Sequence, residues 1–326
     1  MKKALVTGAA GFIGANVCHQ LLKQEIEVVG IDNLNDYYDP KLKKHRVSGL
    51  EGKSGFQFKQ MDIENAEMVQ QLFKTHKFDV VYNLAARAGV RYSLVNPTVY
   101  FTTNTLGSLN LLQAMVNANV SKFVLASTSS LYAGEPIPFS EDLPVNRPIS
   151  PYAASKKAAE QIAYTYHYHY KIDATVVRYF TVFGPAGRPD MSIFRFVYWI
   201  DRGMPVEMFG DGEQTRDFTY VDDIASGTIL AGRPLGYEII NLGGGKTPVS
   251  LNQMIRLIEK GLGKKANVIR KPAQKADLVE TQADIRKASQ LLNWQPQISF
   301  EEGIERTIKW YQENKSLIDA LVLNDA

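Results

Sequence analysis

The chain has 326 residues, 45% hydrophobic and 22% charged, which is the composition of an ordinary globular protein of about two domains. Its 37 basic and 34 acidic residues leave a net charge of +3 and form no basic block, so no nucleic-acid partner is expected. No apolar run is long enough for a membrane span, so no membrane partner is expected, and the single cysteine excludes an intrachain disulfide.

The cysteine and the start of the chain bear on location. Cys18 lies in an apolar helical stretch, where we expect it to pack in the core rather than act as a nucleophile. The first expected strand starts almost at Met1, which leaves no room for a signal peptide. These features predict a reducing, cytoplasmic location.

The first half of the chain alternates β-branched runs with stretches of helical periodicity. In chain order, the pattern predicts a strand at 4–7, a helix at 12–24, strands at 27–31 and 56–60, a helix at 68–75, a strand at 79–83, a helix at 99–117, a strand at 122–126, a helix at 151–170 and a strand at 174–178. Alternation of this kind predicts right-handed crossovers and a parallel sheet covered on both faces. The expected class is therefore a doubly wound, Rossmann-type α/β fold.

The pattern changes after about Phe180. Pro, Gly and Arg cluster at 184–189, and later helices are separated by longer irregular stretches. Two of these helices have capping boxes, formed by Ser250 with Gln253 and by Ser299 with Glu302. We expect residues 1–180 to form the larger domain, with about 215–245 returning to it, and residues 181–326 to form a smaller mixed α/β substrate domain.

A glycine-rich turn joins the first strand to the first helix. Glycines allow a tight turn and bring backbone N–H groups close to a pyrophosphate, which the helix N-terminus also attracts. Asp32 follows the second strand, 18 residues beyond Gly14, where a carboxylate would accept hydrogen bonds from ribose hydroxyls and repel a 2′-phosphate. The segment predicts bound NAD rather than NADP, although Asp32 could instead only cap a turn. The cofactor residues expected from these segments, including a possible adenine contact after the third strand, are Gly8, Gly11, Phe12, Ile13, Gly14, Asp32, Asn33, Asp62 and Ile63.

The helix expected at 151–170 carries a tyrosine and a lysine four residues apart. Ser150 suits the N-cap and Pro151 the first helical position, so Tyr152 and Lys156 share one face. A tyrosine base working near neutrality needs a pKa well below its usual value of about 10. The Lys156 ammonium and a positive nicotinamide ring are cations able to lower it. We therefore expect Tyr152 as the catalytic base and Lys156 as its charge partner and a ribose ligand; the alternative is an ordinary surface helix.

The glycine spacing GxxGxxG, together with the run Asn83–Ala86 that ends the fourth strand, resembles the extended short-chain dehydrogenase/reductase family. The resemblance covers nearly the whole chain. It implies that the Thr128 hydroxyl completes a triad with Tyr152 and Lys156, and that a homodimer pairs the helices at 99–117 and 151–170. Further cofactor contacts implied by it are Leu84, Ala85, Ala86, Asn104 and Tyr179.

Residues next to Thr128 narrow the reaction within that family. The 4,6-dehydratases carry Asp-Glu where this chain has Ser129 and Ser130, which cannot eliminate water by acid–base catalysis. The UDP-xylose-forming decarboxylases have a glutamate in this segment and an asparagine in place of Thr181. Oxidation at C4 followed by reduction from the opposite face, which is epimerisation, is the reaction that remains.

Five segments, at 32–40, 88–93, 180–185, 188–191 and 216–223, resemble the UDP-glucuronate 4-epimerases, which interconvert UDP-glucuronate and UDP-galacturonate. The chain departs from them at Arg87, at Ala186, where relatives usually have a bulkier residue, and at 274–277. The resemblance implies that Arg216 neutralises the diphosphate, unless it is only a structural partner of Asp217. The full set of implied substrate contacts is Arg91, Ser93, Ser129, Ser130, Thr181, Arg188, Met191, Phe194, Arg216 and Asp277.

The sugar acid sets a physical constraint on such an enzyme. Oxidation at C4 of a glucuronate gives a β-keto acid, which loses CO₂ when the breaking bond aligns with the carbonyl π system. A bidentate fork from Arg188 can hold the carboxylate out of that alignment, unless Arg188 is a solvated loop charge. Alternatives left open are an epimerase for neutral UDP-sugars, a UDP-glucuronate decarboxylase and an NAD-binding regulatory protein. His167 and His169 point about 200° apart on a helix, and we expect no metal site.

Overall fold

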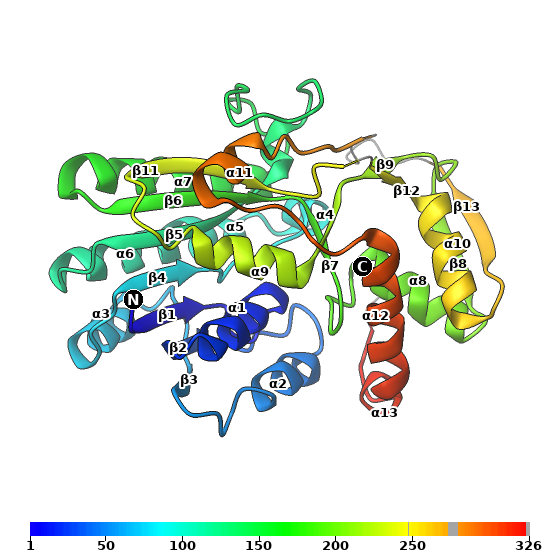
Figure 1. Ribbon diagram of the computed structural model, residues 1–326, viewed down its shortest axis with the longest axis horizontal. Coiled ribbons are helices and arrows are strands. Elements are labelled where there is room, and N and C mark those ends of the chain that lie inside the picture. Colours follow the sequence, from blue (N-terminus) through cyan, green and yellow to red (C-terminus); the bar gives the residue numbers. More distant parts are fainter. Residues whose placement is uncertain (247, 273–279, 324–326) are drawn as a thin grey trace.

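The computed structural model describes residues 1–246, 248–272 and 280–323 (Figure 1). Its centre is a seven-stranded sheet in the order β11-β6-β5-β4-β1-β2-β3, and every neighbouring pair is parallel. The expected doubly wound, Rossmann-type α/β class is confirmed. The strands are β1 (Lys3–Thr7), β2 (Glu27–Asp32), β3 (Phe56–Gln60), β4 (Val80–Asn83), β5 (Lys122–Thr128), β6 (Asp173–Tyr179) and β11 (Tyr237–Leu242).

Helices cover both faces of this sheet because its strands are apolar on both sides. Along β1, Ala4 and Val6 belong to the core on one face, and Leu5 belongs to the core on the other. The first face is covered by α1 (Phe12–Lys23), α9 (Val221–Leu230) and α11 (Arg286–Leu292). The second face is covered by α3 (Ala66–Thr75), α6 (Gly107–Asn117) and α7 (Pro151–Tyr170). Cys18 is buried in the core on the first face, as expected, and burial raises the pKa of its thiol.

A separate core, termed the second core, lies to one side of the sheet, at the right of Figure 1. It is distinct from the layers that cover the two faces of the sheet. It is built on β8 (Pro205–Phe209) paired in parallel with β13 (Asn267–Lys271), and on α8 (Ser192–Asp201), α10 (Leu251–Leu262), α12 (Phe300–Glu313) and α13 (Lys315–Asp319). The two expected capping boxes mark helix starts, since Ser250 accepts a hydrogen bond from the Gln253 N–H and Ser299 one from the Glu302 N–H. The helix α2 (Pro40–Ser48) contributes Leu42 to this core.

The chain passes several times between the sheet and the second core. After α8 and β8 it returns to the sheet for α9 and β11, goes back for α10 and β13, and returns again for α11 and Trp294. The short elements β7 (Thr181–Phe183), β9 (Thr215–Arg216), β10 (Phe218–Tyr220) and β12 (Val249–Ser250) lie on these passages. The expected division at residue 180 included a return to the sheet at about 215–245. It did not include the later return of α11, which packs on the sheet.

The expected helix at 99–117 is not one continuous α-helix. It consists of α5 (Thr98–Tyr100), a π-helical turn η1 (Phe101–Leu106) and α6, and it follows the short helix α4 (Val90–Val95). Asn104 lies in the π turn, where its amide binds the main chain of Arg87 and the hydroxyl of Ser155. π-turns of this kind are often found at functional sites. Among the described residues, no helix has the length and apolar character needed to cross a membrane.

Candidate active site

One large cavity, of about 1300 Å³, lies between the carboxyl ends of the sheet strands and the second core. Ligands bind at this edge in open α/β sheets. Most residues expected from the sequence line it: Gly8, Gly11, Phe12, Ile13, Gly14, Asp32, Asn33, Asp62, Ile63, Leu84, Ala85, Ala86, Arg91, Thr128, Ser129, Ser130, Tyr152, Lys156, Tyr179, Thr181, Arg188, Met191 and Arg216.

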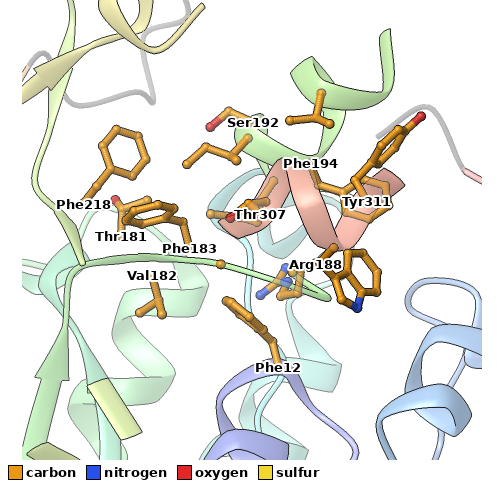
Figure 2. A pocket seen from close by; sticks show the side chains of 16 residues that line it. Phe12, Thr181, Val182, Phe183, Arg188, Ser192, Phe194, Phe218, Thr307 and Tyr311 are labelled. Carbon is orange, nitrogen blue, oxygen red and sulfur yellow. The ribbon is translucent and has the colours of Figure 1, made fainter. Parts of the chain in front are cut away.

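Three of the remaining expected residues do not line this cavity. Asn104 and Ser93 are buried behind the cavity wall, and the Ser93 hydroxyl donates to the carbonyl of Val90. Phe194 lines a smaller pocket of about 30 Å³, which Figure 2 shows between α8, α12 and the segment 181–188. Asp277 lies outside the described residues.

The glycine-rich turn is shaped by close backbone approaches. Gly8 has φ +69°, and a Cβ there would lie 2.8 Å from the amide nitrogen of Ala85. A Cβ on Gly14 would lie 2.0 Å from the carbonyl oxygen of Gly8, so only glycine fits. The turn therefore brings the N-terminus of α1 against the end of β1, a geometry that suits a pyrophosphate.

Asp32 ends β2 beside this turn and is almost fully buried. Its carboxylate accepts hydrogen bonds from the N–H groups of Leu34, at 2.8 Å, and Ala10, at 3.2 Å. It thus caps the following turn and also faces the cavity, so the two readings of this residue are compatible. The glycine turn and this carboxylate together fit the pyrophosphate and ribose of NAD.

Replacing Asp32 with alanine tests this assignment. We expect NAD affinity to fall by roughly tenfold or more, because the ribose hydroxyls lose a charged acceptor. NADP affinity should fall less or rise, since a repelling charge is removed. Titration calorimetry with both dinucleotides measures the change, and equal losses for the two would contradict the assignment.

The triad expected from sequence and resemblance converges in the cavity. Thr128 ends β5, the 3₁₀ turn η2 (Ser129–Tyr132) follows, and α7 begins at its N-cap Ser150. The Thr128 hydroxyl and the Tyr152 phenol are hydrogen-bonded. The Lys156 Nζ lies one turn further along α7 and donates to the carbonyl of Ala126 at 2.9 Å.

Burial in the folded cavity shifts the pKa values of both the phenol and the lysine of this set. Burial raises the pKa of Tyr152, and the hydrogen bond with Thr128 and the charge of Arg188 offset this only in part. Burial also lowers the pKa of Lys156 to about 8, although the charge of Glu160 acts in the opposite direction. In the protein itself, desolvation of Tyr152 outweighs the charge of Arg188, and the lowering expected from Lys156 together with the nicotinamide ring stays a prediction.

Arg188 is not a solvated loop charge. Its Nε and Nη2 form a fork to the Asp190 carboxylate, at 3.0 and 2.5 Å, and its guanidinium lies over the ring of Tyr37, 5.5 Å from the centroid. The same charge lowers the pKa of Asp190 against the effect of burial. The residues Tyr37 and Asp190 were not expected to hold Arg188, although both lie in segments that carry the resemblance.

Two further aromatic residues connect Arg188 to the triad. Tyr100 packs edge-to-face on Tyr152, with ring centroids 6.0 Å apart, and donates to the carbonyl of Gly89 at 2.9 Å. Tyr37 packs edge-to-face on Tyr92, with centroids 5.7 Å apart. Burial raises the pKa of both Tyr37 and Tyr100, which favours their neutral phenols. The base therefore lies in an aromatic, largely desolvated wall.

Further expected substrate residues line another part of the cavity wall. Thr181 is in β7, Arg216 is in β9, and Arg91 packs its guanidinium 4.9 Å from the ring centroid of Phe209. The Arg216 Nη1 donates to the carbonyl of Thr215 at 2.8 Å. Its neighbour Asp217 accepts hydrogen bonds from main-chain N–H groups, including those of Gly245 and Ala283. This wall thus adds two cations to the cavity.

A dinucleotide turn, a Tyr-Lys-Thr triad and a cationic wall in one cavity define a nucleotide-dependent oxidoreductase or isomerase of the Rossmann class. The model of the NAD dependent epimerase/dehydratase family matches residues 4–243, and the chain belongs to this family. The expected family is thereby confirmed.

Named relatives narrow the comparison further. The chain is 56% identical, over 97% of its length and 98% of the other, to the UDP-glucuronate 4-epimerase of Thermodesulfobacterium geofontis (strain OPF15). It superposes with a TM-score of 0.89 on the UDP-glucuronic acid 4-epimerase from Bacillus cereus in complex with UDP-glucuronic acid and NAD, at 39% identity and covering 95% and 99% of the two chains. The Thermotoga maritima UDP-glucose 4-epimerase with UDP-glucose has a TM-score of 0.87, at 32% identity and covering 96% and 99%.

Proposed function

We propose that the chain is a UDP-glucuronate 4-epimerase, which interconverts UDP-glucuronate and UDP-galacturonate with bound NAD. The observation that carries the proposal is the presence in one cavity of the Thr128–Tyr152–Lys156 set and a partly buried, oriented Arg188. The similarity to two UDP-glucuronate 4-epimerases along almost the full chain supports it.

The residues of the chain then have distinct tasks. NAD, when bound by the glycine turn and Asp32, supplies reversible hydride transfer at C4 of the sugar. Tyr152 takes the proton of the 4-hydroxyl group and later returns one to the same oxygen. The Thr128 hydroxyl stabilises the phenolate by its hydrogen bond, and Lys156 contributes a positive charge on the same helical face. Arg216 and Arg91 neutralise the diphosphate.

The sugar carboxylate needs its own binding site. The 4-keto uronate is a β-keto acid, so the C5–C6 bond must be held away from alignment with the C4 carbonyl. Asp190 occupies the Nε and Nη2 edge of Arg188, and we propose that the sugar carboxylate meets Nη1, with Ser129, Ser130 and Thr181 donating hydroxyl groups. The fixed fork lets Arg188 act as an oriented charge.

The proposal is tested by incubating the purified protein with UDP-glucuronate, UDP-glucose and UDP-N-acetylglucosamine without added reductant. We expect conversion of UDP-glucuronate to UDP-galacturonate, resolved by chromatography and mass. Conversion of the neutral sugars alone would establish the neutral-sugar alternative. Release of CO₂ with a UDP-pentose as the main product would establish a decarboxylase, and bound NAD without turnover would favour a regulatory protein.

The assembly and the division of the chain are also proposals. We propose a homodimer formed through η1, α6 and α7, in a cytoplasmic setting. Support comes from exposed aromatic and aliphatic side chains on these elements, namely Phe101, Leu106, Tyr164 and Tyr168. We further propose that residues 1–180, with about 215–245, bind NAD, and that the rest of 181–326 binds the UDP-sugar. Light scattering coupled to size exclusion gives the mass in solution.

A further inference from the structure

A buried arginine outside the described triad connects the two halves of the cavity. Arg46 lies on α2, and only 5% of its surface is exposed. Its guanidinium donates to main-chain carbonyls of two segments that are far apart in the sequence. One is the glycine-rich turn, and the other is the loop that leads into Arg188.

The geometry uses every side of the guanidinium fork. Nη1 donates to the carbonyl of Ala10 at 3.1 Å and to the Tyr38 hydroxyl at 2.6 Å. Nε and Nη2 donate to the carbonyl of Ala186 at 3.0 and 2.8 Å, and Nη2 also donates to that of Gly187 at 3.3 Å. The guanidinium also lies over the Tyr38 ring, 5.4 Å from its centroid. A planar fork with five donors can bridge two loops in this way, and a single ammonium cannot.

Both segments held by Arg46 carry groups assigned to the proposed reaction. The N–H of Ala10 donates to the Asp32 carboxylate, while its carbonyl accepts from Arg46. On the other side, Ala186 and Gly187 directly precede Arg188. Arg46 therefore ties the cofactor turn to the loop that bears the proposed carboxylate ligand.

The loop has a reason to need this tie. Ala186 has φ +53°, a left-handed conformation that costs a non-glycine residue free energy unless its surroundings hold it. The segment 181–188 also borders the small pocket between Phe12 and the residues Thr307 and Tyr311, as Figure 2 shows. Packing on this side is incomplete, so hydrogen bonds to the carbonyls contribute more to the position of the loop.

We propose that Arg46 is a positioning residue that fixes the Arg188 loop against the cofactor turn and thereby sets the ratio of epimerised to decarboxylated product. The inference rests on the proposed function. When the carboxylate is misplaced, the C5–C6 bond of the 4-keto sugar breaks and C6 leaves as CO₂. The electron pair of that bond forms the enolate of the C4 ketone, and C5 then takes up a proton to give a UDP-4-keto-pentose.

The test compares Arg46→Met and Arg46→Lys with Leu42→Ala. Leu42 lies on the same helix and is fully buried in the second core, so its truncation weakens α2 without removing either carbonyl contact. For each variant we would measure the melting temperature, the NAD dissociation constant and the ratio of CO₂ to UDP-galacturonate formed from UDP-glucuronate. Both Arg46 variants should raise that ratio by roughly tenfold and weaken NAD binding several-fold. Leu42→Ala should lower only the melting temperature.

Two outcomes overturn the proposal. One is an equal rise of the CO₂ ratio in Leu42→Ala, which would make the effect one of general destabilisation. The other is full rescue by Arg46→Lys, which would show that charge and not bridging is required. If the unmodified protein forms no UDP-galacturonate, the proposed function fails. The role of Arg46 is then tested by NAD affinity alone, and an NAD dissociation constant that is unchanged in Arg46→Met would overturn the inference.

Discussion

Replacing Tyr152 with phenylalanine should reduce turnover of UDP-glucuronate by roughly a hundred- to ten-thousandfold. The variant loses only the phenol oxygen, which hydrogen-bonds with Thr128 and is the proposed acceptor of the 4-hydroxyl proton. The ring still packs on Tyr100, so the wall of the cavity keeps its shape. Turnover is measured at saturating substrate, together with the NAD content of the purified protein, which should not change.

A matched control for this variant is available on the same helix. Tyr170 is exposed at the end of α7, so Tyr170→Phe should retain full turnover. The assignment of Tyr152 as the base would be wrong if Tyr152→Phe retained near-normal turnover. A loss of NAD together with activity would instead indicate a role in cofactor binding.

The second large effect concerns stability. Replacing Arg178 with methionine should lower the free energy of unfolding by about 3–5 kcal/mol, because it leaves a buried carboxylate with only the longer, 3.8 Å ion pair to Lys157. Arg178 on β6 and Glu160 on α7 are essentially inaccessible to solvent, and Nε and Nη2 of the arginine each donate to a different carboxylate oxygen at 2.9 Å. Ser127 donates to the same carboxylate at 2.6 Å.

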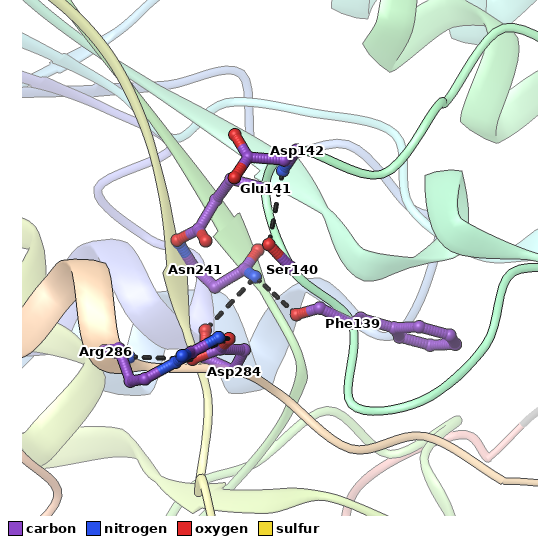
Figure 3. Close-up of polar contacts among 7 residues, drawn as sticks. All are labelled: Phe139, Ser140, Glu141, Asp142, Asn241, Asp284 and Arg286. Atoms are coloured by element: carbon purple, nitrogen blue, oxygen red, sulfur yellow. Dashed lines mark hydrogen bonds and ion pairs between the residues drawn. The ribbon is translucent and has the colours of Figure 1, made fainter.

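The pair is part of a longer buried chain of hydrogen bonds. Arg178 Nη1 donates to the Tyr132 hydroxyl, which donates to the side-chain oxygen of Asn241. Figure 3 shows the continuation, in which the Asn241 amide donates to the carbonyls of Phe139 and Asp284. This series of hydrogen bonds thus connects α7, the turn after Thr128 and the strand β11, and its loss should destabilise all three.

Urea unfolding of Arg178→Met, Glu160→Gln and the double variant separates the contributions. The double variant should be more stable than the sum of the two losses implies, since the buried charge is removed with its partner. Lys309→Met is the surface control, because Lys309 pairs with Glu313 at an exposed site of α12 and should change little. A loss below about 1 kcal/mol for Arg178→Met would contradict the proposed cost of an unpaired buried charge.

Local signals explain what the sequence could predict. The β-branched runs and helical periods located β1 to β6 and the helices α1, α3 and α7, and the glycine turn and Ser150–Pro151 located two helix starts. The strand β11 and the helices α9 and α11, which complete the main sheet and its cover, were not predicted. Ser250 and Ser299 located two more. The π turn at Phe101–Leu106 was not predicted, because it depends on contacts of Asn104 with Arg87 and Ser155, which are distant in the sequence.

The site shows the same division between local and long-range information. Tyr152 and Lys156 could be predicted from a motif at a helix start, and Thr128 was implied by the family resemblance. The fork between Arg188 and Asp190 and the bridging role of Arg46 did not, because each depends on where a loop lies after folding. The extent to which burial raises the pKa of Tyr152 could not be predicted for a related reason, since burial is a property of the folded cavity and not of the residue.

The repeated passage of the chain between the two cores limits how this enzyme can be re-engineered. Beyond residue 190, the second core is assembled from three separate stretches, around α8 and β8, around α10 and β13, and around α12 and α13, and α2 adds Leu42 from the first half of the chain. The sugar-binding part of another protein therefore cannot be introduced as one contiguous segment after residue 180 to change the specificity. Three inserts would have to be exchanged together, with α9, β11 and α11 left in place to close the sheet. A chimaera made with a single crossover after residue 180 should leave both the sheet and the second core incompletely packed. Its exposed apolar residues should then cause aggregation.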